Sequence, residues 1–350
     1  MAIHVVNEAR RCLHCKKPMC REGCPINTNI PEVIELFRTG HKEDAGAMLY
    51  ENNPLSVICS LVCDHDKQCE GHCVLGRKGA PVHFSSIENY ISDSYLDHLH
   101  LEMQPKTGQR VAIIGSGPAG ITISILLAQR GYQVTMFESR EKIGGVLRYG
   151  IPEFRLPKSI LDRYQKQLTQ LGIRIRPNTA IGRTLTVDDL QRDGYEAIFI
   201  GTGVWKPKAM GIPGESLGNV NYAIDYLVNP DVYDLGDDLV VIGAGNSAMD
   251  VARTALRKGV RRVNVFCRRY QTAASVREVD YAKADGGGNF STESPPHPHR
   301  GRWRLLQESR DERGRQHHQH QRGTVLPVQQ RHHCHQSGRT EPHRQHHHRS

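Results

Sequence analysis

Apolar residues along the chain form short runs of four to six residues, separated by longer stretches with helical periodicity. The short runs cover residues 110–114, 133–137, 197–200, 238–242 and 262–267 and are rich in Val and Ile. Runs of this length and composition are typical of parallel strands that are buried on both faces. The pattern therefore predicts an α/β protein built on parallel sheets.

The longer stretches predict helices between and before these strands. In the first of them Pro31 stands in the opening turn, and Val33, Ile34 and Phe37 fall on one face. The predicted helices cover residues 30–37, 43–50, 87–99, 121–131, 159–171 and a stretch ending at 259. Those before residue 100 precede every predicted strand, so we expect a small helical unit ahead of the α/β part.

The first predicted strand opens a glycine fingerprint. Residues 110–114 lead into Gly-Ser-Gly-Pro-Ala-Gly, a helix follows, and the strand 133–137 ends at Glu138. This order is typical of a dinucleotide-binding unit. Gly115 permits a tight turn, Gly117 lets the backbone approach a pyrophosphate, and Gly120 lets helix and strand pack closely. Glu138 would accept hydrogen bonds from a ribose, unless the turn serves packing alone.

Further glycines favour an extended cofactor at this first site. Gly144 and Gly145 lie just beyond the acid, and Arg148 follows in the same segment. The strand 197–200 is followed by a second glycine-rich segment, made of Gly201, Thr202 and Gly203. Close passage of the chain along a long ligand favours FAD over a nicotinamide nucleotide here.

A second fingerprint follows the strand 238–242. Its candidate nucleotide contacts are Gly243, Gly245, Asn246 and Ser247, with an alanine at the third glycine position. The next strand ends at Arg268 and Arg269 where an acid would bind the 2′-hydroxyl of NAD. Arginines suit the 2′-phosphate of NADP, so NADPH is preferred to NADH. The alternative is that both arginines form an exposed basic strand end.

Cysteines are concentrated before the first fingerprint. Eight of the ten lie between residues 12 and 73, in two groups of four. The groups are Cys12, Cys15, Cys20 and Cys24, and then Cys59, Cys63, Cys69 and Cys73. Iron–sulfur clusters take cysteines from short loops of such uneven spacing, whereas structural zinc prefers two close pairs for each ion. We expect two iron–sulfur clusters, with zinc and disulfides as the alternatives.

The charge of the chain is concentrated at its end. The formal charge is +9, and residues 287–350 hold eleven Arg against five acids, together with twelve of the twenty His. This segment has eight apolar residues, too few to offset chain entropy, so a disordered tail is expected. No run approaches the length of a membrane span and no secretory signal is visible, so the expected compartment is the cytoplasm.

The composition of residues 287–350 also indicates that this segment is translated from a shifted reading frame. Histidine codons read one base later encode Ile or Thr, and the genetic code permits residues 331–337 to be read as Val-Ile-Ile-Ala-Ile-Ser-Gln. Such a segment would be a buried strand. The alternatives are a genuine disordered tail and a metal-binding histidine tract, and the coding DNA around residue 286 would decide among the three.

Two fingerprints behind a cysteine-rich unit form a specific combination. Over residues 5–286 the chain resembles the small (beta) subunit family of NADPH-dependent glutamate synthase. That family is related to the flavin subunits of NADPH:ferredoxin oxidoreductases and to the N-terminal half of dihydropyrimidine dehydrogenase. The resemblance is carried by residues 12–25, 62–74, 144–157, 243–250 and 277–279.

The resemblance implies a ligand set for two [4Fe-4S] clusters. By similarity to dihydropyrimidine dehydrogenase, one cluster would be held by Cys12, Cys15, Cys20 and Cys73. The other would be held by Cys24, Cys63 and Cys69, with Glu88 in place of a fourth cysteine. Cys59 would then be free. Spacing alone does not choose between this set and one made only of cysteines.

The resemblance also implies the domain order and the function. Residues 1–103 would be the cluster domain, 104–234 the first part of an FAD domain, 235–286 a truncated NADPH domain, and 287–350 an aberrant tail. Electrons would pass from NADPH through FAD and the clusters to a large glutamate synthase subunit, which forms L-glutamate from glutamine and 2-oxoglutarate. The alternatives are a ferredoxin-type acceptor, a pyrimidine-reducing subunit and a catalytically dead iron–sulfur scaffold. An alternative of a different functional class is a zinc-binding protein whose basic tail binds nucleic acid. We expect neither nucleic acid nor a membrane as partner.

Overall fold

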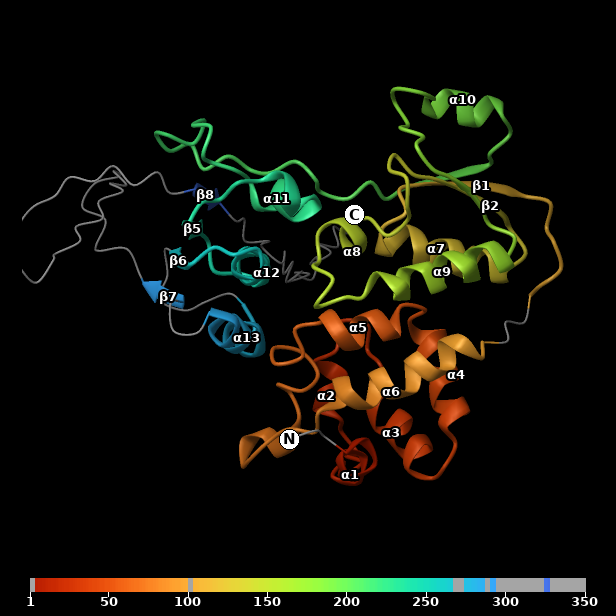
Figure 1. Cartoon of the computed structure of the whole chain (residues 1–350). Helices are drawn as coiled ribbons and strands as arrows, with labels where there is room; N and C mark the ends of the chain where they lie inside the picture. The colour runs from red at the N-terminus through yellow and green to blue at the C-terminus, as the bar shows by residue number, and fades with distance from the viewer. Residues whose placement is uncertain (1–3, 100–102, 267–273, 287–289, 294–323, 328–350) are drawn as a thin grey trace, which may run out of the picture.

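The computed structural model describes residues 4–99, 103–266, 274–286, 290–293 and 324–327. A helical unit at the N-terminal end lies beneath two separate α/β units, each with its own sheet (Figure 1). This architecture confirms the predicted fold class, an α/β chain with a helical N-terminal domain and two Rossmann-like units. None of the helices in the described ranges is long and apolar enough to cross a membrane.

The N-terminal unit consists of short helices around one apolar core. Its helices are α1 (Val5–Arg10), α2 (Met19–Glu22), α3 (Ile30–Arg38), α4 (Lys42–Asn52), α5 (Ser56–Val62), the 3-10 turn η1 (Val74–Arg77) and α6 (Phe84–Asp97). The core includes Val33 and Ile34 of α3 and Ile87 and Ile91 of α6, all essentially inaccessible to solvent. Three of the cysteines, Cys12, Cys20 and Cys73, pack against this core.

The first sheet is parallel and has the strand order β3-β2-β1-β4. Its strands are β1 (Arg110–Ile114), β2 (Gln133–Phe137), β3 (Arg174–Arg176) and β4 (Ala197–Ile200). Its helices are α7 (Pro118–Gln129), α8 (Val146–Tyr149), α9 (Lys158–Gln170) and α10 (Val187–Arg192). This is the order of the first four strands of a doubly wound nucleotide-binding fold, in which ligands bind where the order reverses, beside the first strand.

The register of this sheet brings three predicted residues to one edge. Ile114, the last residue of β1, stands opposite Phe137 of β2 and Ile200 of β4. The next residue along each strand is Gly115, Glu138 or Gly201. Because parallel strands end at the same edge, these three residues lie next to one another at the carboxyl end of the sheet.

The second sheet repeats the same arrangement, with the order β7-β6-β5-β8. Its strands are β5 (Asp238–Ile242), β6 (Arg262–Phe266), β7 (Phe290–Glu293) and β8 (Thr324–Pro327). Its helices are α11 (Ala223–Val228), η2 (Pro230–Val232), α12 (Asn246–Arg257) and α13 (Val276–Gly286). All pairings are parallel, so each half of the α/β part has the topology of the same fold.

Two of these strands lie in the segment expected to hold no folded element. β7 pairs with β6, and β8 pairs with β5. Strand pairing uses backbone groups, so a short segment can extend a sheet even where the surrounding sequence is polar, and Pro327, which lacks an amide hydrogen, stands at the end of β8. The expectation of a wholly disordered tail is therefore wrong for residues 290–293 and 324–327. The segment 331–337 lies outside the described residues.

The cluster unit and the first α/β unit share one apolar core. Val57 and Ile58 of α5 are buried together with Leu161 of α9 and with residues of β1 and β2. The hydroxyl of Tyr164 donates a hydrogen bond to the Pro54 carbonyl at 2.7 Å, which fixes α9 above the start of α5. The helical unit is thus packed firmly against the first nucleotide fold.

Candidate functional site

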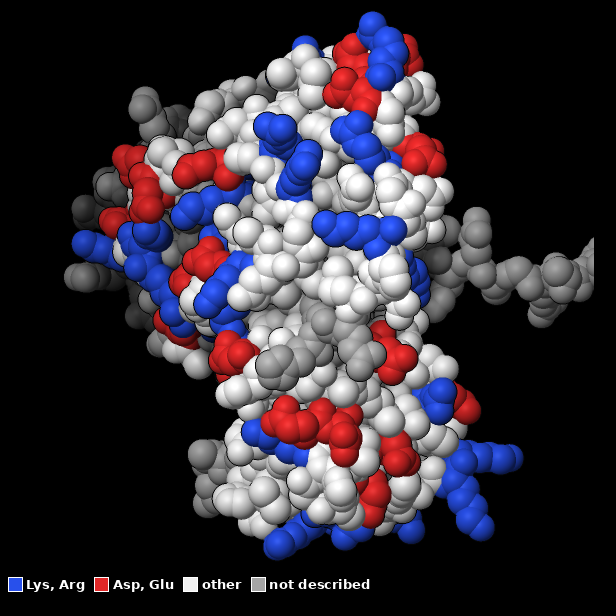
Figure 2. Space-filling view, turned by 90° about the vertical axis from the view of Figure 1, so that its right-hand side faces the viewer, with Lys and Arg blue, Asp and Glu red and all other residues white. Residues whose placement is uncertain are grey.

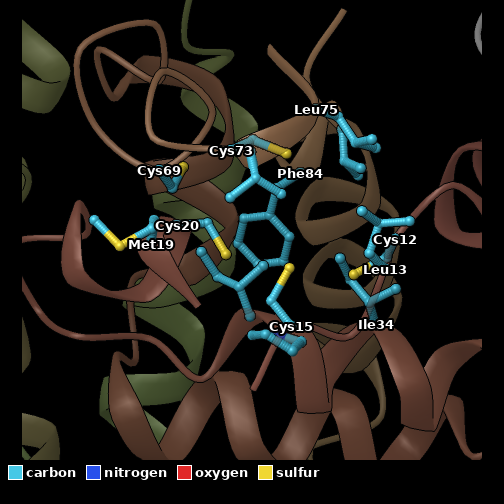
Figure 3. A pocket seen from close by; sticks show the side chains of 14 residues that line it. Cys12, Leu13, Cys15, Met19, Cys20, Ile34, Cys69, Cys73, Leu75 and Phe84 are labelled. Carbon is cyan, nitrogen blue, oxygen red and sulfur yellow. The ribbon is translucent and has the colours of Figure 1, made fainter. Parts of the chain in front are cut away.

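Four cysteine side chains of the N-terminal unit surround one cavity. Figure 3 shows Cys12, Cys15, Cys20 and Cys73 pointing into the space between them. The rest of the lining is apolar and includes Ile34 and Phe84, with Cys69 also at the wall. Three of these four cysteines come from one short stretch and the fourth comes from the end of the second group, which closes the ring.

The chemistry of this cavity suits a cationic centre bound by thiolates. Burial raises the pKa of the Cys20 thiol to about 11 and also raises that of Cys12, and the neighbouring thiols add to both shifts. Deprotonated sulfurs here require a metal to compensate their charge. Across the described ranges no three Cys, His, Asp or Glu side chains converge as the ligands of a single ion would.

A second set of potential ligands lies next to the first. The thiol of Cys69 interacts with Cys24 and Glu88, and Cys63 interacts with Cys69, Glu88 and Cys59. Glu88, on α6, is buried, and this burial raises its pKa well above the ordinary value. Its carboxyl also faces Cys59 and Cys24, so both candidates for a fourth ligand lie beside the same three cysteines.

Cys59 has hydrogen-bond partners of its own. Its sulfur accepts a hydrogen bond from Asn53 Nδ2 at 3.1 Å, and it bonds to the thiol of Cys63 one helical turn later. The bond to Cys63 lowers the pKa of Cys59 to about 7 despite burial. The amide of Asn53 is held in place because its Oδ1 accepts from the Leu55 amide at 3.0 Å.

The three glycines of the first fingerprint have different environments. Gly115 has a φ of +98°, and a Cβ there would lie 2.5 Å from the Gly201 carbonyl oxygen. A Cβ on Gly120 would lie 2.0 Å from the carbonyl oxygen of Gly115, so the turn itself requires these two glycines. A Cβ on Gly117 would meet nothing closer than the Cα of Gly145 at 4.0 Å. The protein's own packing does not demand Gly117, and the space above it lies at the N-terminus of α7, where a phosphate binds well.

Glu138 is buried at the end of β2 with its carboxylate fully engaged. Its Oε2 accepts hydrogen bonds from the Ser116 amide at 3.0 Å and from the Ser116 hydroxyl. Its Oε1 accepts from the Arg140 amide at 2.9 Å and from the Ser139 hydroxyl at 3.1 Å. These bonds tie the acid to the glycine turn.

The other glycine segments lie beside the first turn. The amide of Gly144 donates to the Ser116 carbonyl at 2.9 Å, and a Cβ on Gly145 would approach the Cα of Gly117 to 2.7 Å. Gly201, Thr202 and Gly203 continue from β4 along the same edge. The predicted glycine segments are thus brought together around Gly115 and Gly117.

The Arg148 guanidinium is held by protein groups. It donates to the Ile143 carbonyl at 2.8 Å and to Asp162 Oδ1 at 2.6 Å. In this position it fixes α8 against α9, and its Nε and one terminal nitrogen have partners without any ligand.

In the second fingerprint, as in the first, one glycine is required by its backbone conformation and another leaves open space. Gly243 has a φ of +123°, whereas a Cβ on Gly245 would meet nothing within 4 Å. The Asn246 side chain accepts a hydrogen bond from the Ser275 amide at 2.9 Å, and Ser247 is exposed at the start of α12. An open space again lies above a helix N-terminus. Arg268 and Arg269 lie outside the described residues.

The sequence analysis missed an aromatic cluster next to Glu138. The Arg140 guanidinium lies 4.4 Å from the ring centroid of Tyr149 and 4.3 Å from that of Trp205. Flat cationic and aromatic groups of this kind can stack against an adenine ring. Only the position of Arg140, two residues beyond the acid, could have indicated it, because Trp205 lies far along the chain, just after β4.

A buried ion network joins the two nucleotide folds. Arg155, from the segment after α8, contacts Asp250 of α12 at 2.7 Å and Glu278 of α13 at 3.1 Å. Glu278 also pairs with Arg253 at 2.9 Å. The side chains of all four residues are less than one tenth exposed. The opposite charges thus offset one another where the two units meet.

One of these carboxyls gives a pH dependence with a definite sign. Burial raises the pKa of Asp250 from 3.8 to about 6, against the opposing attraction of Arg155. Between these values the folded chain holds a proton that the unfolded chain has released, so this contribution to stability falls as pH rises. We expect the free energy of unfolding of wild type, minus that of Asp250→Asn, to fall by up to about 3 kcal/mol between about pH 4 and about pH 7. Urea unfolding across this range measures it, and a constant difference would contradict it.

Two known families match successive, overlapping parts of the chain. Residues 2–99 match the family described as dihydropyrimidine dehydrogenase domain II, 4Fe-4S cluster. Residues 83–191 and 109–282 match the family described as pyridine nucleotide-disulphide oxidoreductase. The first match covers the helices that carry the thiols, and the second covers both fingerprints.

Individual relatives align with most of the chain. The glutamate synthase [NADPH] small chain of Azospirillum brasilense is 35% identical over 303 residues, covering 80% of this chain and 62% of that protein. The small chain of Escherichia coli K12 is 34% identical, covering 80% of this chain and 63% of that protein. The NAD-dependent dihydropyrimidine dehydrogenase subunit PreT of Escherichia coli O157:H7 is 32% identical, covering 80% of this chain and 68% of that protein.

The chain spans somewhat less than two thirds of the length of these glutamate synthase chains. Among solved structures, FprA of Mycobacterium tuberculosis in complex with NADPH is 25% identical with a TM-score of 0.44, covering 53% of this chain and 48% of that one. The sequence matches are long and cover both the thiol-bearing helices and the fingerprints. The chain therefore belongs to the pyridine nucleotide-disulphide oxidoreductase family, as a relative of the glutamate synthase small chains that carries a 4Fe-4S domain at its N-terminal end.

Proposed function

We propose that this chain is an electron-input unit that takes hydride from NADPH and delivers single electrons to a partner protein. FAD in the first fold would accept the hydride, and two [4Fe-4S] clusters in the helical unit would carry the electrons onward. The observation that carries this proposal is the cavity ringed by Cys12, Cys15, Cys20 and Cys73, since it belongs to a unit that shares its core with the first nucleotide fold.

The proposed FAD contacts come from the edge of the first sheet. Gly117 and the first turn of α7 would receive the pyrophosphate, because the space above Gly117 is open and the helix dipole favours anions there. Gly115 and Gly120 would shape the turn. The remaining proposed contacts are Glu138, Gly144, Gly145, Arg148, Gly201, Thr202 and Gly203.

The proposed NADPH contacts come from the second fold. Gly245 leaves an open space at the N-terminus of α12, as Gly117 does in the first fold. Gly243, Asn246 and Ser247 complete the turn. Arg268 and Arg269 would bind the 2′-phosphate and so select NADPH, whereas the name of the relative PreT specifies NAD. The nicotinamide preference of this chain is therefore a point to test.

The proposed cluster ligands are divided as the neighbouring side chains suggest. Cys12, Cys15, Cys20 and Cys73 would hold one cluster. Cys24, Cys63 and Cys69 would hold the other, with the buried carboxyl of Glu88 as fourth ligand. In the metal-free chain the Cys63 thiol donates to Cys59. As a cluster ligand Cys63 would be a thiolate without a hydrogen, so Cys59 would then donate to it while Asn53 donates to the Cys59 sulfur.

The proposed acceptor is a second protein. Relatives named as glutamate synthase small chains point to a large subunit that forms L-glutamate from glutamine and 2-oxoglutarate, and a ferredoxin-type protein is the alternative acceptor. We propose a cytoplasmic setting for this reaction. On the face shown in Figure 2, basic and acidic side chains are interspersed over the upper and lower parts of the molecule.

Anaerobic purification followed by absorbance spectroscopy tests the function. We expect flavin absorbance together with a broad brown iron–sulfur shoulder, and bleaching of the flavin by NADPH but not by NADH. Brown material without flavin would support the scaffold alternative, in which a chain shorter than its relatives keeps only the clusters. Equal bleaching by both nucleotides would refute the proposed role of Arg268 and Arg269, and colourless zinc-containing protein would refute the whole proposal.

A further inference from the structure

Two neighbouring side chains of the first nucleotide fold are inserted into the second. Phe154 and Arg155 belong to the segment between α8 and α9. The Phe154 ring lies 4.4 Å from the Arg253 guanidinium and 4.2 Å from that of Arg257, both on α12. Arg155 reaches Asp250 on the same helix. One dipeptide therefore holds α12 through two different kinds of contact.

The contact extends from α12 to α13. The Arg155 guanidinium pairs with Glu278, Arg253 bridges Glu278 and Asp285, and Arg257 pairs with Asp285 at 3.1 Å. Three guanidinium groups thus face three carboxylates at the seam, the contact of the segment between α8 and α9 with α12 and α13. Arg155 is the member of this group that the first fold supplies, so among the described residues it links this ion network to the first fold.

The position of α12 matters because this helix begins at the second fingerprint. Asn246 opens α12, and Asp250 follows one turn later. A contact that fixes Asp250 therefore also fixes the position of the turn that would hold the nucleotide. The described chain between β4 and β5, residues 201–237, contains only the short elements α11 and η2. This connection leaves the orientation of the second fold to be set by side-chain contacts: those of Phe154 and Arg155 with α12 and α13, and that of Arg277 with Glu70 of the helical unit at 3.5 Å.

We propose that Arg155 is a positioning residue, which sets the second nucleotide fold at the angle and distance that hydride transfer to the first requires. This proposal rests on the proposed function. Reacting atoms must approach to within roughly 3–3.5 Å for transfer, and an error of about 1 Å can cost about 100-fold in rate. Arg155 would act through α12 and touch neither nucleotide, so its loss should change the rate of transfer more than nucleotide binding.

The experiment compares Arg155→Met and Arg155→Lys with wild type in the full chain. For Arg155→Met, we expect the limiting rate of flavin reduction by NADPH to fall about 10- to 100-fold, with the half-saturating NADPH concentration within about twofold and with FAD and iron content unchanged. Lysine keeps the charge but cannot bridge two carboxylates as a fork, so most of the loss should remain. Arg262→Met is the control, because Arg262 pairs with Asp238 within the second sheet, and it should leave both values unchanged.

The double variant Arg155→Met/Asp250→Asn separates positioning from stability. It removes the buried carboxylate that Arg155→Met leaves without its partner, so thermal stability should recover while the rate stays low. Recovery of the rate along with stability would overturn the proposal, as would an unchanged rate in Arg155→Met.

A wild-type chain that binds no FAD, or is not reduced by NADPH, would refute the proposed function. Hydrogen exchange then tests the contact of Arg155 with α12 without any cofactor. Faster exchange of the α12 amides in Arg155→Met than in Arg262→Met would support the proposal that Arg155 holds α12 in place. Equal exchange in the two variants would overturn it.

Discussion

Replacing Cys20 with alanine is expected to lower the iron content from about eight to about four atoms per chain, with one of the two clusters lost. Cys20 faces Cys12, Cys15 and Cys73 across a largely apolar cavity, where no other ligand-type side chain could take its place except Cys69. Cys69 interacts with Cys24 and Glu88 and belongs to the neighbouring set. Iron and acid-labile sulfide analysis of anaerobic protein measures the loss.

The matched control for this prediction is Cys59→Ala. Cys59 lies among the second set but is proposed to donate a hydrogen bond to Cys63, so this variant should keep about eight iron atoms. Its effect should be confined to the reduction potential of one cluster. Loss of iron in Cys59→Ala would show that Cys59 is a ligand, and full retention of iron in Cys20→Ala would contradict the proposed first cluster.

Substitutions at Gly117 and Gly120 are expected to separate cofactor binding from folding. A methyl group on Gly120 would overlap the Gly115 carbonyl oxygen, 2.0 Å away, and both atoms belong to a turn that cannot shift independently. We expect Gly120→Ala to destabilise the first nucleotide fold by about 3 kcal/mol or more. Thermal unfolding followed by circular dichroism measures this loss.

Gly117→Ala should behave in the opposite way. Its backbone has a φ of −70°, which alanine adopts freely, and its Cβ has room, so stability should change by less than about 0.5 kcal/mol. The methyl group would occupy the space proposed for the pyrophosphate, so FAD affinity should fall about 10- to 100-fold. Fluorescence titration of the cofactor-depleted chain measures it. Unchanged FAD affinity in Gly117→Ala, or normal stability in Gly120→Ala, would contradict this division of roles.

The sequence by itself determined five of the strands of the two nucleotide folds. The runs 110–114, 133–137, 197–200 and 238–242 are strands at those bounds, and the fifth ends one residue earlier, at Phe266. The reason is local: apolar β-branched runs between glycine turns have few alternatives to a buried parallel strand. Once parallel pairing is assumed, it also follows that Gly115, Glu138 and Gly201 meet at one edge. The cofactors proposed for these edges remain predictions.

Only the tertiary structure decided where several helices begin, and it alone showed, apart from the resemblance, which thiols lie near one another. The helix predicted to start at residue 87 starts at Phe84, because Glu70 accepts a hydrogen bond from the Ser85 amide and Glu8 accepts one from the His83 amide. Helix α5 was not predicted, since its apolar face is buried against a different unit.

Sequence patterns also did not reveal which distant residues meet among the thiols and between the two nucleotide folds. Cys73 joins Cys12 and Cys20 in space, although more than fifty residues separate it from them. Arg155 meets Asp250 across 95 positions of the chain. Periodicity and spacing report neighbours within a few turns, whereas partners brought together by packing depend on the whole fold.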